Sequence, residues 1–221
     1  MKKLLVVLGL LVLVPGLALA QVGTSATTYY VDYYANNAGA ASVYDQVVRI
    51  INVGTLGTPL TVPVGDICAN IYVFDADQEL QSCCAERLTP NELDAAFVGV
   101  QLTGINPGVC IPGAPACAGL PVTLTGVAPA SGVIKIALTP DPTGAACDPR
   151  NALTGADATE GVVFGTHLQT TGGFVFVTET EKTPSILSAG EAGFLPQACS
   201  FAVYLGSGRG QCWSSVSTGL H

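Results

Sequence analysis

Turn-forming residues divide this chain into many short segments. It contains 26 glycines and 14 prolines, and these residues separate almost all of its apolar stretches. The stretches are rich in Val, Ile, Tyr, Phe and Thr, which favour strands over helices. The predicted strands cover residues 27–34, 47–53, 67–74, 93–103, 120–124, 133–138, 162–168 and 174–180. Many short strands with frequent turns predict a mainly β fold, in the form of an antiparallel β-sandwich.

Two segments have a helical pattern. Residues 77–84 are predicted to form a short turn of helix. The second segment, 188–205, begins with a capping box: Ser188 caps the first turn and Glu191 bonds back to it. Pro196 lies inside this segment and lacks an N–H, so it is expected to kink or divide the helix. The sandwich is therefore expected to carry a short C-terminal helical segment.

The first twenty residues have the pattern of an export signal. Two lysines precede an almost unbroken apolar run at 4–14, and Ala18-Leu19-Ala20 offers the small residues that a signal peptidase reads. Pro15-Gly16 interrupts the run before it reaches the roughly 20 residues that span a bilayer. We predict that residues 1–20 are a cleaved signal peptide and that no transmembrane segment remains. The mature protein is then secreted, to the periplasm, the cell surface or the medium.

The mature chain, residues 21–221, has the length of one domain. Cleavage leaves six basic against 16 acidic residues, a net charge of about −10. This balance disfavours nucleic acid and anionic membranes as partners, because both require a basic surface. Charged residues make up only 11% of the sequence, below the roughly 25% of an ordinary soluble domain. Such a surface suits assembly or weak contact with glycans.

Eight cysteines belong to the mature chain: Cys68, Cys83, Cys84, Cys110, Cys117, Cys147, Cys199 and Cys212. An even number of cysteines in an exported protein indicates disulfides, here four bridges. A zinc site is disfavoured, because the chain has no C-x₂-C pair and only two histidines, His167 and His221.

Local sequence restricts some of the disulfide pairings. Cys83 and Cys84 are neighbours, and a bridge between neighbours is strained, so each is expected to have a separate partner. Turn-rich loops lie within Cys110–Cys117 and within Cys199–Cys212, and each loop is able to bring its two end cysteines together. The remaining connectivity stays open.

Two blocks of sequence share a recognisable pattern. The first combines YVFD at 72–75, the pair Cys83-Cys84 and Thr89-Pro90, and the second combines LSAGE at 187–191, Cys199 and GSGRGQC at 206–212. Together they resemble a group of uncharacterised secreted bacterial proteins from soil-type genomes, which share a YVFD…CC…TP block and a closing LSxGE…C…GSGxGxC block. Residues 166–169 and 178–180 fit the same pattern.

The resemblance covers most of the mature chain, and it implies export and a shared fold but no known activity. Relatives often carry two further cysteines where this chain has Glu86 and Ser215. If those cysteines bridge one another in relatives, this chain lacks that bridge and keeps an even number of cysteines.

His167 is the first candidate for chemistry. It lies in a predicted strand and is the one histidine away from the terminus. A hydrolytic triad needs a nucleophile and an orienting acid beside such a base, and no G-x-S-x-G elbow accompanies it. We expect a structural hydrogen bond, and keep a hydrolase centred on His167 as an alternative.

Acidic residues at spacing two follow the predicted strand 67–74. Asp75, Asp77 and Glu79 offer hard oxygen ligands of the kind that calcium prefers. The loop glycine and distal glutamate of an EF-hand are missing, so ordinary surface carboxylates remain the default interpretation. Calcium is the one cofactor that the sequence suggests.

Four tyrosines lie on the first predicted strand. Because side chains alternate along a strand, Tyr30 and Tyr34 face one side, and Tyr29 and Tyr33 the other. One pair is expected in the core. The other pair, assigned to Tyr29 and Tyr33, is a candidate for stacking on a sugar ring.

The favoured hypothesis is a secreted, non-catalytic β-sandwich with a structural, adhesive or surface-interaction role, through self-association or a cell-surface partner. Export, low charge content and disulfides agree with this hypothesis. The alternative is an extracellular binding module that depends on carbohydrate or calcium, and the third hypothesis is the His167 hydrolase.

Overall fold

The computed structural model describes residues 27–35, 46–61, 63–102, 131–141, 143–144, 146–171, 174–204 and 210–211. The predicted signal peptide, the predicted strand 120–124, Ser215, and three cysteines (Cys110, Cys117 and Cys212) lie outside these residues. Within the described part, no helix combines the length and apolar character needed to cross a membrane.

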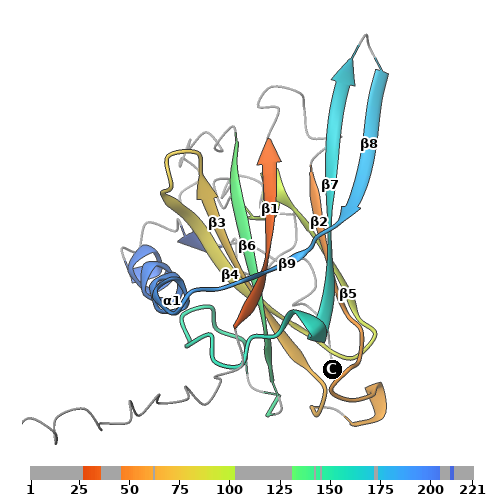
Figure 1. Ribbon diagram of the computed structural model, residues 1–221, viewed down its shortest axis with the longest axis vertical. Coiled ribbons are helices and arrows are strands. Elements are labelled where there is room, and N and C mark those ends of the chain that lie inside the picture. The colour runs from red at the N-terminus through yellow and green to blue at the C-terminus, as the bar shows by residue number, and fades with distance from the viewer. Residues whose placement is uncertain are drawn as a thin grey trace, which may run out of the picture.

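Two sheets form the molecule (Figure 1). The six-stranded sheet has the order β10-β4-β3-β6-β1-β9, and the four-stranded sheet has the order β5-β2-β7-β8. The first contains β1 (Thr28–Ala35), β3 (Ile67–Asp75), β4 (Leu80–Leu88), β6 (Ser131–Pro140), β9 (Pro184–Ile186) and β10 (Gly210–Gln211); the second contains β2 (Val47–Asn52), β5 (Leu93–Phe97), β7 (Gly161–Thr171) and β8 (Phe174–Glu181). All pairs are antiparallel except β10 with β4. The predicted mainly β, antiparallel sandwich is confirmed.

Alternation along the strands builds the core between the sheets. On β1, Tyr30 and Tyr34 are buried in it, together with Val48 from β2 and Val163 from β7. The expected division of the four tyrosines is thus confirmed, with Tyr30 and Tyr34 as the core pair. Each hydroxyl still finds an acceptor: Tyr34, for example, donates to the carbonyl of Phe74 at 3.1 Å.

Strand β3 is buried on both faces. Its Ile71 and Val73 point into the core between the sheets, whereas Tyr72 and Phe74 belong to a second apolar cluster on the outer face. This arrangement explains why β3 is almost continuously apolar, since neither face meets water.

Helix α1 (Ala189–Tyr204) covers the second cluster with Leu195 and Cys199 (Figure 1). The Glu191 N–H donates to Ser188 Oγ at 3.1 Å, so half of the predicted capping box forms. The other half does not, because the Glu191 carboxylate pairs with Lys135 on β6 instead. Pro196 lies within the helix without dividing it, so the expected division was wrong and the expected kink stays a prediction. Leu195 and Cys199 hold the helix on the sheet on both sides of the proline.

Two other predictions about elements were wrong. Residues 77–84 form a turn and the first half of β4, not a helix, because Gln78 adopts a left-handed φ of 69° that reverses the chain. The predicted strand 93–103 ends at Phe97 and continues as a π-helical segment, Val98–Leu102. There the Gln101 side chain accepts the Phe97 N–H at 2.6 Å.

Disulfides join two strands of the six-stranded sheet to segments that are distant in the sequence. Cys83 bonds to Cys199 and so attaches α1 to β4, and Cys68 bonds to Cys147. Cys84 is also disulfide-bonded, and the described part contains no free cysteine. The separate partners expected for Cys83 and Cys84 are therefore confirmed. Closure of the Cys199–Cys212 loop by its own cysteines was wrong, because packing of α1 places Cys199 against β4.

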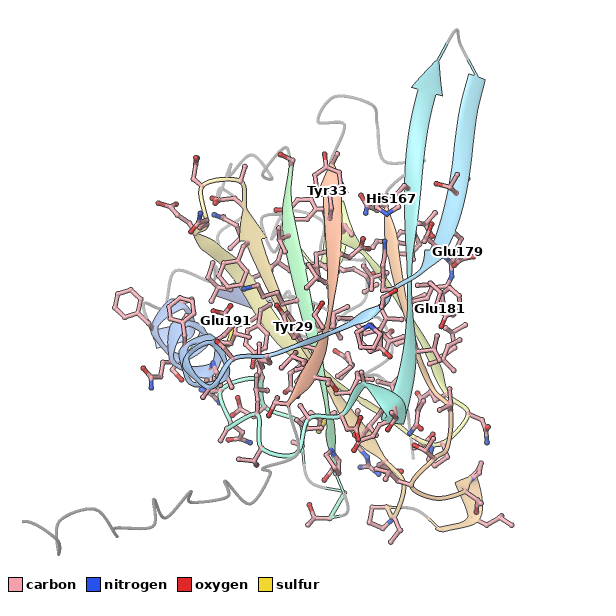
Figure 2. The ribbon with its side chains drawn as sticks, viewed as in Figure 1. Tyr29, Tyr33, His167, Glu179, Glu181 and Glu191 are labelled. Carbon is pink, nitrogen blue, oxygen red and sulfur yellow. A yellow bond between two sulfur atoms is a disulfide. The ribbon has the colours of Figure 1, made fainter. Side chains whose placement is uncertain are left out.

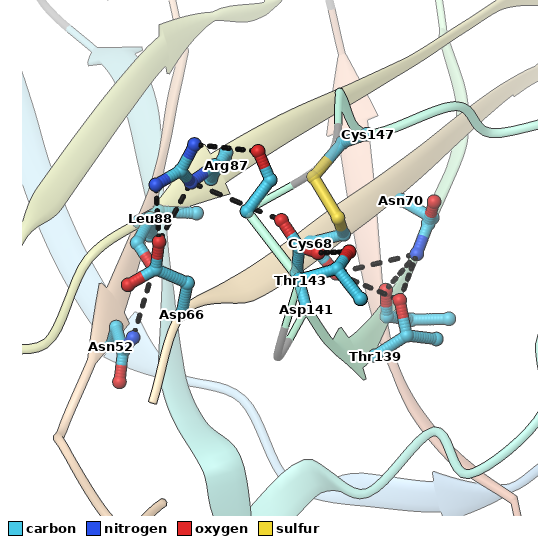
Figure 3. Close-up of a disulfide and its surroundings, with 12 residues drawn as sticks. Asn52, Asp66, Cys68, Asn70, Arg87, Leu88, Thr139, Asp141, Thr143 and Cys147 are labelled. Carbon is cyan, nitrogen blue, oxygen red and sulfur yellow. Dashed lines mark hydrogen bonds and ion pairs between the residues drawn. A yellow bond between two sulfur atoms is a disulfide. The ribbon is translucent and has the colours of Figure 1, made fainter. Parts of the chain in front are cut away.

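The Cys68–Cys147 bridge lies in a polar network (Figure 3). Arg87 pairs with the buried carboxylate of Asp66 at 2.6 Å and donates to the carbonyl of Gly144 at 3.1 Å. These bonds and the bridge hold the segment after β6 against β3 and β4. They stabilise this end of the sandwich and offer no free ligand set.

Candidate functional site: a buried Asp–His–Lys cluster

Polar side chains from both sheets converge where β1 approaches β7. Asp32 lies on β1, His167 on β7, and Lys182 directly follows β8, while Gln46 precedes β2. In Figure 2, Tyr33 and His167 lie close together at this junction. The cluster thus bridges the two sheets at an edge of the sandwich.

Asp32 is the centre of the cluster. It is in phase with Tyr30 and Tyr34, so it faces inward, and its side chain is 0% exposed. Its Oδ1 lies 2.7 Å from Lys182 Nζ and 3.4 Å from His167 Nε2. Its Oδ2 is buried and has no hydrogen-bond partner among the described residues. A buried carboxylate with one unpaired oxygen is costly, so only a strong partner such as Lys182 retains it there.

Gly165 on β7 makes room for this pair. A Cβ at this position would lie 2.1 Å from Asp32 Oδ2 and 2.5 Å from Lys182 Cε. Any other residue would displace the carboxylate or the lysine stem. The Asp32–Lys182 pair therefore requires a glycine at position 165.

His167 contacts three polar neighbours. Its Nε2 lies 3.0 Å from Lys182 Nζ in addition to the Asp32 contact, and its Nδ1 lies 3.4 Å from Gln46 Nε2. The ring also stacks on Tyr33, with centroids 6.5 Å apart and planes 16° apart. The structural hydrogen bonds expected for His167 are present.

The Gln46 amide is itself fixed by the backbone of β1. Its Nε2 donates to the Tyr33 carbonyl at 2.7 Å, and its Oε1 accepts the Ala35 N–H at 3.2 Å. Gln46 therefore presents an N–H, not an oxygen, toward His167 Nδ1. In a neutral ring this places the proton on Nε2, which faces Asp32 and Lys182.

The residues predicted to bind calcium lie far from this cluster in the sequence, at the β3–β4 turn. Asp75 Oδ1 accepts the N–H groups of Asp77 and Glu79, each at 2.9 Å, and Oδ2 accepts from Gln81 at 2.5 Å. Asp75 thus stabilises the turn, while Asp77 and Glu79 are exposed. Calcium at this turn stays a prediction.

The described part contains one group of three side chains whose potential metal-ligand atoms lie within 4.8 Å of one another: Cys68, Asp141 and Cys147. Both of its cysteines are used by a disulfide. A disulfide sulfur is not a thiolate, so this group is not suited to metal binding.

The tyrosines proposed for ligand contact differ from each other. Tyr33 is 56% exposed and stacks on His167. Tyr29 is half-buried and packs against the second apolar cluster. Of the predicted pair, only Tyr33 combines an exposed ring with a neighbouring polar cluster.

Sequence reasoning found His167 and Tyr33 but missed Asp32, Lys182 and Gly165. The sequence alone could have indicated Asp32, because it is a charged residue on the same face of its strand as the core tyrosines. The sequence could not indicate Lys182, because its contact with Asp32 forms only when β1 and β7 pack against each other in the folded protein.

No protein-family model, no curated protein and no solved structure matches this chain.

Proposed function

We propose that the protein is a secreted, non-catalytic β-sandwich that acts by contact, and that it associates with a second copy of itself through the outer face of α1. The observation that carries the proposal is the exposure of Phe194 and Phe201 on that helix, at 50% and 66%. Large aromatic side chains in water are typical of contact surfaces.

The two phenylalanines share one stripe of the helix. Residues seven apart in an α-helix point in nearly the same direction, and Gly190 and Gln197 lie beside them on the exposed side. The opposite stripe, with Leu195 and Cys199, is packed on the sheet. A helix with apolar residues on both sides is expected to pack against another surface on both sides.

The charge of the molecule favours a second copy as the partner. The chain has an excess of eight acidic over basic residues, yet the stripe contains no charged residue. Glu191, the acidic residue of α1, is paired with Lys135. Two copies can therefore approach through this face without repulsion between carboxylates, whereas a basic partner would find no countercharge. Burying one phenylalanine contributes roughly 2 kcal/mol.

A non-catalytic role also fits the contacts of His167. Both ring nitrogens face Gln46, Asp32 or Lys182. Among the described residues, no Ser, Thr or Cys side chain is hydrogen-bonded to the ring. The resemblance to secreted bacterial proteins remains a prediction that agrees with this role.

Light scattering after size exclusion tests the proposal. The mature protein is expected to gain mass with concentration in the micromolar range, and the double variant Phe194→Ser/Phe201→Ser is expected to stay monomeric. Phe97→Ser is the matched control, because Phe97 is 45% exposed but lies on β5. A wild-type protein that stays monomeric, or a double variant that associates as well as wild type, would contradict the proposal.

Glycan binding at Tyr33 is a second candidate. Its exposed ring, held by stacking on His167, offers a fixed platform for a sugar. Binding of oligosaccharides that Tyr33→Ala abolishes, and that Tyr29→Ala leaves unchanged, would favour this module over self-association.

A further inference from the structure

We propose that Lys182 and Asp32 react to form an intramolecular amide bond, with His167 as the proton relay. The reacting groups are already in contact, because Lys182 Nζ lies 2.7 Å from Asp32 Oδ1. The inference is independent of how the molecule associates. It would make this cluster a site of self-modification.

Burial favours the reaction over a lasting ion pair. The Asp32 side chain is fully buried and the Lys182 side chain is 12% exposed, so both charges are held largely out of water. Desolvation of a buried ion pair is costly unless every lone pair is satisfied, and Asp32 Oδ2 is not satisfied within the described structure. An amide bond removes both charges and one of the two carboxylate oxygens.

The hydrogen bonds of His167 place its Nε2–H beside both reacting groups. Because Gln46 presents an N–H to Nδ1, the neutral imidazole carries its proton on Nε2. That N–H lies 3.0 Å from Lys182 Nζ. Nε2 also lies 3.4 Å from Asp32 Oδ1. It is therefore placed to pass a proton from the ammonium to the carboxylate, which frees the Nζ lone pair for attack.

The step balances without any other reactant. One proton first passes from the Lys182 ammonium to an Asp32 carboxylate oxygen through His167 Nε2. The Nζ lone pair then attacks Asp32 Cγ, a C–N bond forms, and the bond from Cγ to the protonated oxygen breaks. Starting from an ammonium and a carboxylate, two of the three ammonium protons leave with that oxygen as water, and one stays on the amide nitrogen. His167 Nε2 is near both ends of this transfer, 3.0 Å from Nζ and 3.4 Å from Oδ1.

The surroundings hold the reactants in place. Gly165 leaves space for the carboxylate and for Lys182 Cε, which a Cβ would fill. The Lys182 backbone is fixed by its N–H, which donates to the Val163 carbonyl at 2.8 Å. Such orientation lowers the barrier by removing the entropy cost of approach. The product would join β1 to the end of β8, and so link the two sheets in a way that reductants do not break.

Intact mass of the reduced, secreted protein tests the proposal. The wild-type protein is expected to be lighter than its sequence by one water, and its tryptic digest to contain a branched peptide that joins Asp32 to an uncleaved Lys182. Lys182→Arg is the matched variant, because it keeps the positive charge but forms no amide, so its full mass is expected. If Gln21 is the N-terminal residue, its cyclisation with loss of ammonia would lower the intact mass of the wild type and of Lys182→Arg equally, so the difference between the two masses is unaffected. A folded wild-type protein of full mass, with tryptic cleavage after Lys182, would overturn the proposal.

The relay has its own test. His167→Gln keeps both reacting groups, and the cross-linked fraction is expected to accumulate about 10²-fold more slowly than in wild type. Accumulation at the wild-type rate would overturn the relay function of His167.

Discussion

Glu160 shows how burial changes the chemistry of a single residue. It belongs to the short 3₁₀ turn Ala158–Glu160 before β7, where the Tyr30 hydroxyl donates to the carbonyls of Ala158 and Gly161. Glu160 is buried, and its Oε2 has no partner within the described residues. Burial, aided by the negative charge of Asp157, raises the pKa of Glu160 to about 8.

This raised pKa predicts that stability falls as pH rises. Below the usual pKa of 4.5 the group is protonated in both the folded and unfolded protein. Between 4.5 and about 8 only the unfolded state ionises readily, so stability decreases through that window by an amount on the order of a few kcal/mol. Urea unfolding should show that Glu160→Gln no longer loses stability at alkaline pH. Near pH 5 its free energy of unfolding should differ little from that of the wild type. Glu79→Gln, an exposed control, should follow wild type; a Glu160→Gln curve with the wild-type slope would contradict the assignment.

Gly165 carries the second residue-scale prediction. Gly165→Ala should destabilise the protein by roughly 2–4 kcal/mol, because its Cβ would overlap Asp32 Oδ2. Gly193→Ala in α1 meets nothing within 4 Å and should stabilise the helix by up to about 1 kcal/mol. Urea unfolding of both variants measures the difference. Equal effects would mean that the space at Gly165 is not needed.

The burial of single residues was predictable from the sequence only where it depends on the alternation of side chains along a strand. Alternation divided the four tyrosines of β1 into two pairs, of which Tyr30 and Tyr34 are buried in the core. The same alternation places Asp32 on the buried face. It was not predicted to be buried, because charged residues are almost never fully buried unless they are paired. Lys182 could not be found, because its position depends on the contact between two sheets.

At the scale of elements, the β3–β4 turn differs from the predicted structure. Asp75 was singled out as a metal ligand, but its carboxylate accepts two backbone N–H groups of the turn. Residues 77–84 were expected to form a short turn of helix, but most of them belong to β4. Ser82, Cys83 and Cys84 are buried in succession there, so the strand lacks a clear alternation of buried and exposed residues.

Asp75→Ala should therefore weaken the turn whether or not calcium is present. We expect a loss of about 1–2 kcal/mol, the usual effect of losing a side-chain cap on backbone N–H groups. Thermal melts with calcium and with a chelator measure it. If calcium raises the wild-type melting temperature and Asp75→Ala removes that rise, the carboxylates bind the ion and the turn is a calcium site.

At the scale of the whole molecule, the disulfides and the two apolar clusters decide the fold together. Composition and turn spacing were sufficient to predict a β-sandwich with a C-terminal helix, because these depend on local periodicity. The pairing of Cys83 with Cys199 was not predictable, because it follows from the packing of α1 over the outer face of β3 and β4.

Disulfide mapping extends this account to the complete chain. We predict four bridges and no free thiol, so full reduction should add the mass of eight hydrogens. Peptides joined through Cys68–Cys147 and Cys83–Cys199 should appear in the unreduced digest. A free thiol in the native protein would contradict an all-disulfide framework and reopen a redox or metal function.

The central claim is that two copies meet through the outer face of α1, and hydrogen–deuterium exchange at low and high protein concentration tests it most directly. The account predicts that amides in the second half of α1, around Phe201, exchange more slowly at high concentration. Amides of the core strand β3 should be unaffected. Exchange in α1 that is independent of concentration, or protection that appears at another surface such as β8 instead, would contradict it.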